Sequence, residues 1–434
     1  MMGSSILFPR KILTEVEKYI DDSGIILLVG ARQVGKTSIL YLLIERLKKK
    51  GVPDSNIYYF DLEEMTLLDI FNSGVKEFTA YLKAIGADAN ERNYIFIDEI
   101  QYMENPTNFL KLLADHYKNL KLIVSGSSTL EIRKKFKDSL AGRKVIFEVY
   151  PLDFYEFLVF KKEKKRLCDA LAKSDIRHVS PGTGIEEIPA RFFAEDLSRY
   201  FNEYAVFGGY PAVAMESVHN KKVTYLSDIY NSYVKKDIKD IMRVDNITAF
   251  NNLLKTLALQ TGNLVNITEL CNTVKIARET VERYLFLLEN TFIIKMLSPF
   301  SSNPRKEISK MSKVYFIDTG LRNIIIKNPD NIDERIDRGV LIENSVFCNM
   351  LKNLSSLEAI HFWRTLAKNE VDFVTVKGNR PMPLEVKCTA FKSAKVPSGI
   401  RHFRKVYEPA KSFVLTRDFF GRNDKTIFMP FWLC

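Results

Sequence analysis

The sequence predicts an α/β protein with a parallel sheet covered by helices near its N-terminus and further domains behind it. A chain of 434 residues is too long for one ordinary hydrophobic core, so we expect two to four domains. Short apolar runs rich in branched side chains occur at residues 25–29, 94–97 and 120–124 and suit strands buried on both faces. A segment with helical spacing of apolar residues follows the first run.

Composition narrows the class of protein. Hydrophobic residues make up 46% of the chain and charged residues 27%, which is typical of a soluble globular protein. The net charge of +11 favours a polyanionic partner such as nucleic acid or an anionic membrane face, although a lysine-rich solvated surface would give the same number.

The lack of targeting signals and of cysteine motifs in the sequence favours a cytoplasmic protein. The five cysteines form no CxxC pair or Cys/His cluster, so neither a zinc site nor a disulfide framework is expected. The N-terminus lacks a signal-peptide apolar stretch, and no run of eighteen apolar residues occurs. We therefore expect a cytoplasmic protein without a membrane partner.

The junction after the first apolar run has the pattern of a phosphate-binding loop. Residues 30–37 spell GxxxxGK[ST], and the helical spacing that follows ends at Gly51. Glycines let the backbone approach phosphates, and loop N–H groups with the positive helix end hold the anion. The alternative is an ordinary glycine-bearing turn between strand and helix. The predicted nucleotide-binding residues are Gly30, Ala31, Arg32, Gln33, Val34, Gly35, Lys36, Thr37 and Ser38.

Each polar side chain of this loop has an expected role with ATP or ADP and Mg²⁺. Lys36 should reach the β- and γ-phosphates, and the Thr37 hydroxyl should hold Mg²⁺. The run NYIFIDEIQ, residues 93–101, supplies the remaining acids at the end of a second buried strand. Asp98 should complete the metal site and Glu99 should act as general base, unless this is simply an acidic strand end.

Together these motifs resemble the AAA+ superfamily of ATPases over residues 1 to about 245. The resemblance implies that the strand within residues 120–130 lies between the two motif strands and carries a polar residue facing the γ-phosphate. Ser127 is favoured over Ser125 and Ser128 for that role. A helix at 129–140 and a strand at 144–149 follow, which places Arg143 where such enzymes carry the arginine that reaches a neighbour's nucleotide. Arg143 could equally anchor a surface turn.

Three further runs, LAGR, YPLDFYEF and FGGYPAV, resemble a prokaryotic group of predicted ATPases with an uncharacterised C-terminal domain. The lid arginine of AAA+ enzymes is not found, which leaves ring assembly and a role of Arg143 in a second subunit open. We expect a nucleotide-binding core at 1–160 and a helical lid within 161–245, with residues 161–189 as a mobile, charged insertion.

A small helical module is expected at residues 246–325. Asn266 can cap a helix beginning at Ile267, a second helix spans 277–290, and FIIKML alternates toward a strand, which is a winged-helix pattern. The second helix could enter a DNA major groove or bind protein. Its exposed face carries two acids as well as two arginines, which weakens the case for DNA: Arg278, Glu279, Glu282 and Arg283.

The last domain, residues 326–434, holds a dispersed set of charged residues. Glu343 lies on an expected helix, Asp372 near the start of a strand, and Glu385 with Lys387 on one face of the next strand. A turn at Gly378 would bring Asp372 toward Glu385. Two carboxylates can bind a divalent cation. The alternative is that these residues form only a structural ion pair on one face of the sheet.

These four residues resemble the PD-(D/E)xK nuclease superfamily, with Val371 in place of its usual proline. The resemblance implies a restriction-endonuclease-like α/β fold and a second divalent metal. We therefore expect an ATPase that hydrolyses ATP with Mg²⁺ and acts near nucleic acid as a machine or switch. An ATP-regulated metal-dependent nuclease and a non-enzymatic nucleotide-switch scaffold for protein partners are the alternatives. The sequence does not indicate the oligomeric state.

Overall fold

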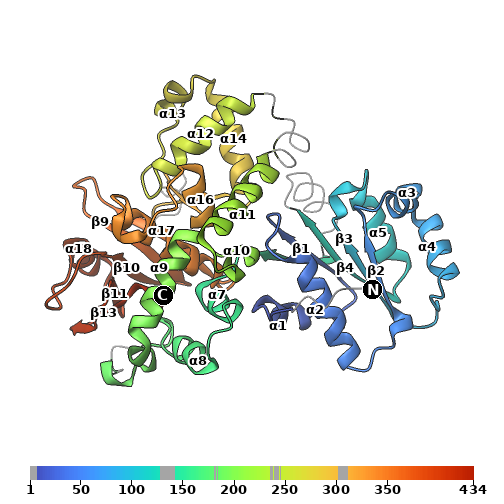
Figure 1. The fold of residues 1–434 in the computed structure, drawn as a ribbon, viewed down its shortest axis with the longest axis horizontal. Helices are drawn as coiled ribbons and strands as arrows, with labels where there is room; N and C mark the ends of the chain where they lie inside the picture. The colour runs from blue at the N-terminus through green and yellow to red at the C-terminus, as the bar shows by residue number, and fades with distance from the viewer. Residues whose placement is uncertain are drawn as a thin grey trace. The chain divides into compact units, whose positions relative to one another are not determined.

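The computed structural model describes residues 7–127, 142–179, 182, 184–234, 238, 244, 246–301 and 311–434. These fall into two compact units, one formed mainly by residues up to Tyr150 and the other mainly by residues from Pro151 onward. Within Figure 1 the first unit is coloured blue to teal and the second green to red. Each unit is described by itself.

The N-terminal unit is built on a five-stranded parallel sheet with the strand order β2-β3-β4-β1-β5. Strand β4 lies between β1 and β3, which confirms the strand arrangement implied by the resemblance. The three central strands are fully buried, as their apolar sequences predict. The strands are β1 (Ile25–Gly30), β2 (Ile57–Asp61), β3 (Asn93–Asp98), β4 (Leu120–Ser127) and β5 (Lys144–Val149).

Helices pack against this sheet (Figure 1). Helix α2 begins directly after the glycine loop, buries Ile39, Leu40 and Leu43, and ends just before Gly51, whose φ of +89° suits glycine. An aromatic cluster joins β2 to α3, α4 and α5 through Phe60, Phe71, Phe78 and Phe109. The helices are α1 (Ile12–Glu17), α2 (Lys36–Lys49), α3 (Met65–Ser73), α4 (Val75–Ala84) and α5 (Pro106–His116), with short 3₁₀ turns η1 (Asp54–Asn56) and η2 (Ile100–Tyr102). The helix expected at 129–140 lies outside the described residues.

The second unit begins with a group of helices. Part of the segment expected to be a mobile insertion, residues 161–189, is helix α8, because Leu167, Cys168 and Leu171 form a buried face. The elements are α7 (Phe154–Phe160), α8 (Lys165–Lys173), η3 (Ile185–Glu187), η4 (Pro189–Phe193), α9 (Ala194–Phe207), α10 (Pro211–Met215) and α11 (His219–Ser232).

Long-range contacts tie these helices to the end of the chain. The amide of Phe154 donates to Asn349 Oδ1 at 2.9 Å, and the Lys411 ammonium donates to the carbonyls of Ile176 and Val179. The helices after residue 151 therefore share a hydrophobic and hydrogen-bonded core with the C-terminal residues.

The middle of this unit has the order helix, helix, helix, strand, strand. Asn266 caps α13 by accepting from the amides of Thr268 and Glu269, as its position predicts. The elements are α12 (Ile247–Leu259), α13 (Ile267–Val274), α14 (Arg278–Asn290) and the antiparallel pair β6 (Ile294–Leu297) and β7 (Lys313–Phe316). This order fits the expected winged-helix pattern, and that assignment stays a prediction.

The C-terminal part is a six-stranded mixed sheet with the order β12-β13-β11-β10-β9-β8. Helix α18 packs on one face through Ile400 and Phe403, which meet Trp363 and Val414. The elements are α16 (Thr319–Ile325), η6 (Ile332–Glu334), α17 (Arg338–Lys352), β8 (Glu358–Arg364), β9 (Glu370–Lys377), β10 (Arg380–Val386), α18 (Ser398–Tyr407), β11 (Ser412–Thr416), β12 (Gly421–Asn423), β13 (Thr426–Pro430) and η7 (Phe431–Leu433).

The FGGYP run has a structural explanation. Gly208 adopts φ +71°, and an added Cβ there would lie 2.1 Å from Asp318 Oδ1. At Gly209 the Leu152 carbonyl oxygen leaves no room for a Cβ, and its amide donates to Asp318 Oδ2 at 2.7 Å. Asp318 is buried and also caps α16 through the Leu321 amide. One carboxylate thus joins the turn after α9 to the start of α16.

Replacing Asp318 by alanine should destabilise the second unit by about 2–4 kcal/mol, because two buried amides lose their acceptor. The midpoint of urea unfolding, followed by circular dichroism, measures this loss. Asp333→Ala is the control, since Asp333 is exposed and pairs only loosely with Arg417, at 3.6 Å. Equal midpoints for the two variants would contradict the role given to Asp318.

Candidate nucleotide site and C-terminal carboxylate cluster

The loop after β1 has the backbone geometry of an anion cradle. An added Cβ at Gly30 would lie 2.2 Å from the Val149 carbonyl oxygen, so only glycine fits there. Gln33 and Gly35 adopt left-handed conformations with φ of +61° and +94°. Alternating right- and left-handed residues turn successive N–H groups toward one side, which favours a bound anion.

The start of α2 completes this cradle. No side chain of the described residues caps the helix at Gly35, so the first-turn amides are left for a ligand or water. The buried Lys36 ammonium donates to the carbonyl oxygens of Gly30 and Ala31 at 3.3 and 3.0 Å. Lys36 therefore crosses the loop in which a phosphate would sit.

Arg10 supports the loop from the N-terminal segment, and the sequence analysis missed it. Its guanidinium donates to the carbonyl oxygens of Val34 and Tyr150, both at 2.8 Å. These bonds tie the phosphate loop to the end of β5. The arginine follows Pro9 with no motif around it, so nothing in the sequence indicated its contact with Val34.

Asp98 is the centre of a hydrogen-bonded group at the carboxyl edge of the sheet. Thr37 Oγ1 donates to Asp98 Oδ2 at 2.7 Å, and Tyr59 Oη donates to the same oxygen at 3.0 Å. Ser125 Oγ donates to the other oxygen, Oδ1. A hydroxyl and a carboxylate so placed are oxygen donors that Mg²⁺ prefers, so Thr37 and Asp98 fit the predicted metal site.

Glu99 adjoins this group in a strained conformation. Its φ of +56° and ψ of +46° are left-handed, which costs energy in a residue other than glycine. Gln101 Nε2 donates to the Glu99 carboxylate, and Gln101 Oε1 accepts from the Ser127 amide at 3.0 Å. Gln101 thus links the predicted base to the tip of β4, a contact that sequence reasoning missed although Gln101 ends the motif run.

Ser127 and Arg143 lie at opposite ends of the sheet. Ser127 pairs in register with Gly30, and its hydroxyl is buried without a hydrogen-bond partner among the described atoms. Arg143 precedes β5 at the amino edge, where its carbonyl accepts from the Ile25 amide. Its guanidinium pairs with Asp115 at 2.6 Å. Arg143 therefore lies away from the phosphate loop of its own chain, and both assigned roles stay predictions.

In the second unit the structure brings together all four residues of the predicted nuclease-like site. Lys387 Nζ lies 2.7 Å from Glu385 Oε1, and Asp372 Oδ2 accepts from the Val386 amide at 2.8 Å. Glu343, on α17, interacts electrostatically with Asp372. The turn at Gly378 and the antiparallel pairing of β9 with β10 produce this meeting, as expected.

Three residues that the sequence analysis missed complete this group, which we call the carboxylate cluster. Lys313 and Tyr315 come from β7, and Glu370 begins β9. Tyr315 Oη donates to Glu343 Oε1 at 2.6 Å, and Lys313 Nζ lies 2.5 Å from Glu370 Oε1. The sequence does carry one signal for Lys313, because this charged residue stands at the start of the apolar run KVYFI, where lysine is unusual.

Burial and mutual repulsion alter the acidity of the carboxylate cluster. Burial, reinforced by the charge of Asp372, raises the pKa of Glu343 to about 7 and the pKa of Glu385 to about 8. Burial also raises the pKa of Asp372. In the described part of the chain, no group of three or more Asp, Glu, His or Cys side chains is placed to hold a metal ion.

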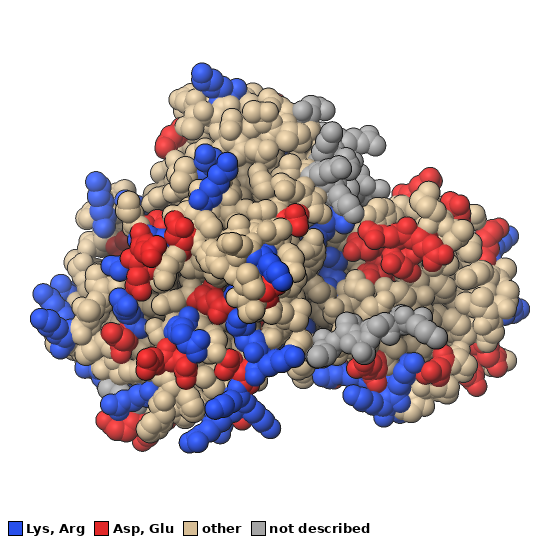
Figure 2. Space-filling view, in the orientation of Figure 1, with Lys and Arg blue, Asp and Glu red and all other residues tan. Residues whose placement is uncertain are grey.

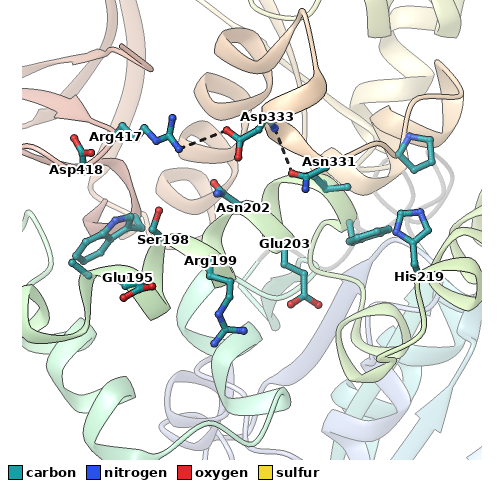
Figure 3. Close-up of a pocket in the computed structure, with 15 residues that line it drawn as sticks. Glu195, Ser198, Arg199, Asn202, Glu203, His219, Asn331, Asp333, Arg417 and Asp418 are labelled. Carbon is teal, nitrogen blue, oxygen red and sulfur yellow. Dashed lines mark hydrogen bonds and ion pairs between the residues drawn. The ribbon is translucent and has the colours of Figure 1, made fainter. Parts of the chain in front are cut away.

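A separate cavity of about 640 Å³ in the second unit contains none of the predicted residues (Figure 3). Side chains of both charges line it, among them Glu195, Arg199, Glu203 and Arg417, and Arg417 pairs with Asp333 across it. Its mixed lining does not select one class of ligand.

Comparison with known sequence families divides the chain into three segments. Residues 22–158 match the AAA domain family, residues 198–331 match a domain of unknown function (DUF8612), and residues 338–432 match another (DUF4143). The first match covers the sheet that carries the phosphate loop. The second match spans the boundary expected at residues 245 and 246 and covers the later part of the expected lid together with the middle module.

The chain also resembles uncharacterised proteins over most of its length. A protein of Haemophilus influenzae is 24% identical over 444 residues, covering all of both chains. A protein of Methanocaldococcus jannaschii is 27% identical over 402 residues, covering 88% of this chain and 82% of its own length. Among solved structures, a Walker-type ATPase of Pyrococcus abyssi aligns with a TM-score of 0.41 and 14% identity, covering 73% of this chain and 95% of its own.

The raised pKa values predict a pH-dependent stability. Glu343 and Glu385 have higher pKa values folded than unfolded, so their stabilising contribution is complete below the unfolded pKa of about 4.3 and disappears as the pH rises through 7 and 8. The melting temperature should therefore fall between about pH 5 and pH 9. Glu385→Gln should reduce that fall by a few degrees, on the order of 3 °C.

Melting curves followed by circular dichroism across this pH range check the prediction. Glu358→Gln is the matched control, because the pKa of Glu358 is lowered by hydrogen bonds to Ser355 and the charge of Lys377, which outweigh its partial burial. If both glutamine variants follow the wild-type pH profile, Glu385 does not carry the dependence.

Proposed function

We propose that the chain binds ATP with Mg²⁺ and hydrolyses it, because residues 22–158 match the AAA domain family. The observation that supports this most is the hydrogen bond of 2.7 Å between Thr37 and Asp98. It places the last residue of the phosphate loop beside the acid of the neighbouring motif. Such a pair is needed to hold a nucleotide-bound Mg²⁺, which would neutralise charge on the phosphates.

The remaining residues of the site supply positioning and proton transfer. Loop amides and the start of α2 hold the phosphates, and Lys36 neutralises charge on the β- and γ-phosphates. Glu99 takes a proton from the water that attacks the γ-phosphorus, and the bond to the ADP oxygen breaks. Because Gln101 contacts both Glu99 and the Ser127 amide, movement of the β4 tip would reorient the base.

We further propose nucleic acid as the partner of the ATP-driven cycle. The net charge of +11 supports a polyanionic partner. Figure 2 shows both signs of charge mixed over the visible face of the second unit and acidic side chains gathered on the first. On α14, Arg278 forms an ion pair of 2.8 Å with Glu282, so part of the exposed basic charge is already neutralised. The support is therefore the net charge, which favours electrostatic binding without sequence selection.

Nuclease activity is not part of this proposal. The four residues of the PD-(D/E)xK pattern do meet, but the buried ammonium of Lys313 lies 3.9 Å from one of them, Glu343, and 2.5 Å from the adjoining Glu370. The alternative of a nucleotide-switch scaffold, with protein partners in place of nucleic acid, is an outcome of the experiments below.

Two substitutions in the nucleotide site should separate binding from hydrolysis. Lys36→Ala should abolish ATP binding, whereas Glu99→Gln should keep binding and reduce phosphate release at least about 100-fold, because it removes the general base. Titration with a fluorescent ATP analogue and steady-state phosphate release, with and without DNA, measure the two effects.

Lys49→Ala is the control for this pair, since Lys49 is an exposed lysine at the far end of the same helix, α2. ATP binding by Lys36→Ala equal to that of wild type would overturn the nucleotide site. ATP binding without hydrolysis above the Glu99→Gln level would leave the nucleotide-switch scaffold.

If nucleic acid is the partner, its affinity should fall steeply with salt, because each neutralised phosphate releases counterions. Filter binding of a DNA duplex between about 50 and 200 mM salt should show a loss of at least about tenfold. Replacing Arg278 and Arg283 together by glutamine should reduce the salt slope, whereas Lys49→Gln should not. Absent or salt-insensitive binding would favour a protein partner instead.

A further inference from the structure

The carboxylate cluster contains its own cation. On β7, Lys313 and Tyr315 are two residues apart and therefore point to the same side, toward the cluster. The Lys313 ammonium lies 2.5 Å from Glu370 Oε1 and 3.9 Å from Glu343 Oε1, while the Tyr315 hydroxyl donates to Glu343. Two side chains of one strand thus contact one oxygen of each of two acids, Oε1 of Glu343 and Oε1 of Glu370.

Lys313 is held in this place. It is 3% exposed, and its ammonium lies 5.4 Å from the centre of the Phe362 ring, a distance suited to a cation–π contact. Burial lowers the pKa of Lys313, but the nearby charges of Glu343, Asp372 and Glu370 outweigh this and raise it. The ammonium therefore stays charged at physiological pH.

The charges of the cluster nearly balance without a metal. Its carboxylates are Glu343, Glu370, Asp372 and Glu385. The cations that face them are Lys313, Lys387 and Arg364, which lies 3.2 Å from Glu370. Four carboxylates and three cations carry a net charge of −1, so one proton shared among the carboxylates leaves the group neutral. A divalent ion added to this group would introduce an excess of positive charge into a partly buried site.

The geometry also disfavours a metal. A hard divalent cation requires several carboxylate oxygens turned toward one point. Here Glu343 and Glu370 turn toward Lys313, and Glu385 Oε1 turns toward Lys387. Glu385 Oε2 is buried without a hydrogen-bond partner among the described atoms, but one free oxygen cannot by itself hold such a cation. The residues that match the nuclease pattern therefore do not fit the metal that the pattern implies.

We propose that the Lys313 ammonium is the resident cation of the carboxylate cluster, where it holds β7 against the C-terminal sheet and excludes Mg²⁺ and Mn²⁺ from Glu343, Asp372 and Glu385. The site matches a metal-dependent nuclease in its residues but is closed by a lysine from the preceding segment. The site becomes accessible to a divalent metal ion only when the Lys313 ammonium is removed.

Binding of Mn²⁺ to the full-length chain tests this proposal directly. Asp98→Asn serves as the background because it removes the carboxylate of the nucleotide site, and no nucleotide is added. Free Mn²⁺ is measured by electron paramagnetic resonance at pH 8. The background protein should bind no Mn²⁺ at the cluster. Adding Lys313→Ala should create a site, so that the affinity of the protein for Mn²⁺ rises at least about tenfold above that of the background protein. Adding Glu385→Gln should abolish the gain.

Two controls separate this effect from general disturbance of the fold. Lys295→Ala removes an exposed lysine from the neighbouring strand β6, which pairs with Glu289 outside the cluster, and should gain no Mn²⁺ binding. Lys313→Met keeps a long side chain over Phe362 and should gain binding as Lys313→Ala does. Circular dichroism confirms that each variant is folded.

The proposal is overturned if the background protein, with Lys313 intact, binds Mn²⁺ and loses it on Asp372→Asn. It is equally overturned if folded Lys313→Met and Lys313→Ala proteins both gain none. The background measurement requires no substitution at Lys313, so it can overturn the proposal even if neither variant folds.

Discussion

The parallel register at the carboxyl edge of the N-terminal sheet is the constraint on which the nucleotide site depends. Because β1 pairs with β4, Gly30 lies beside Ser127, and because β2 pairs with β3, Asp61 lies beside Asp98. Thr37 then needs only the first turn of α2 to reach the Asp98 carboxylate. A shift of one residue in any of these pairings would turn alternate side chains to the other face and separate the acids from the loop.

Much of the N-terminal unit could be predicted because its signals are local. Gly30 and Gly35 are fixed by backbone geometry, and the apolar runs of β1, β3 and β4 reflect burial on both faces. Arg10 and Tyr59 were missed for the opposite reason. Their contacts with Val34 and Asp98 span tens of residues in sequence, and neither has a pattern around it that indicates a partner.

The C-terminal domain shows where a short motif stops being informative. The spacing of Asp372, Glu385 and Lys387 predicted their meeting, since a hairpin turn at Gly378 brings β9 beside β10. The spacing did not predict that a buried lysine would lie among these residues, because Lys313 comes from another strand more than fifty residues earlier. Likewise, charge composition suggested a mobile segment at residues 161–189, whereas the apolar face of α8 made part of it a packed helix.

The contacts that join residues after 151 to the end of the chain bear on how the protein is made. During synthesis the N-terminal unit can bury its own core early, since its strands lie within the first 150 residues. Helix α7 depends in part on residues made much later, because the amide of Phe154 finds its acceptor, Asn349, only when α17 has been synthesised. The side chains of Phe154 and Phe157 pack against Tyr204 of α9, so they can be covered as soon as α9 emerges, and only the hydrogen bond to Asn349 has to form later.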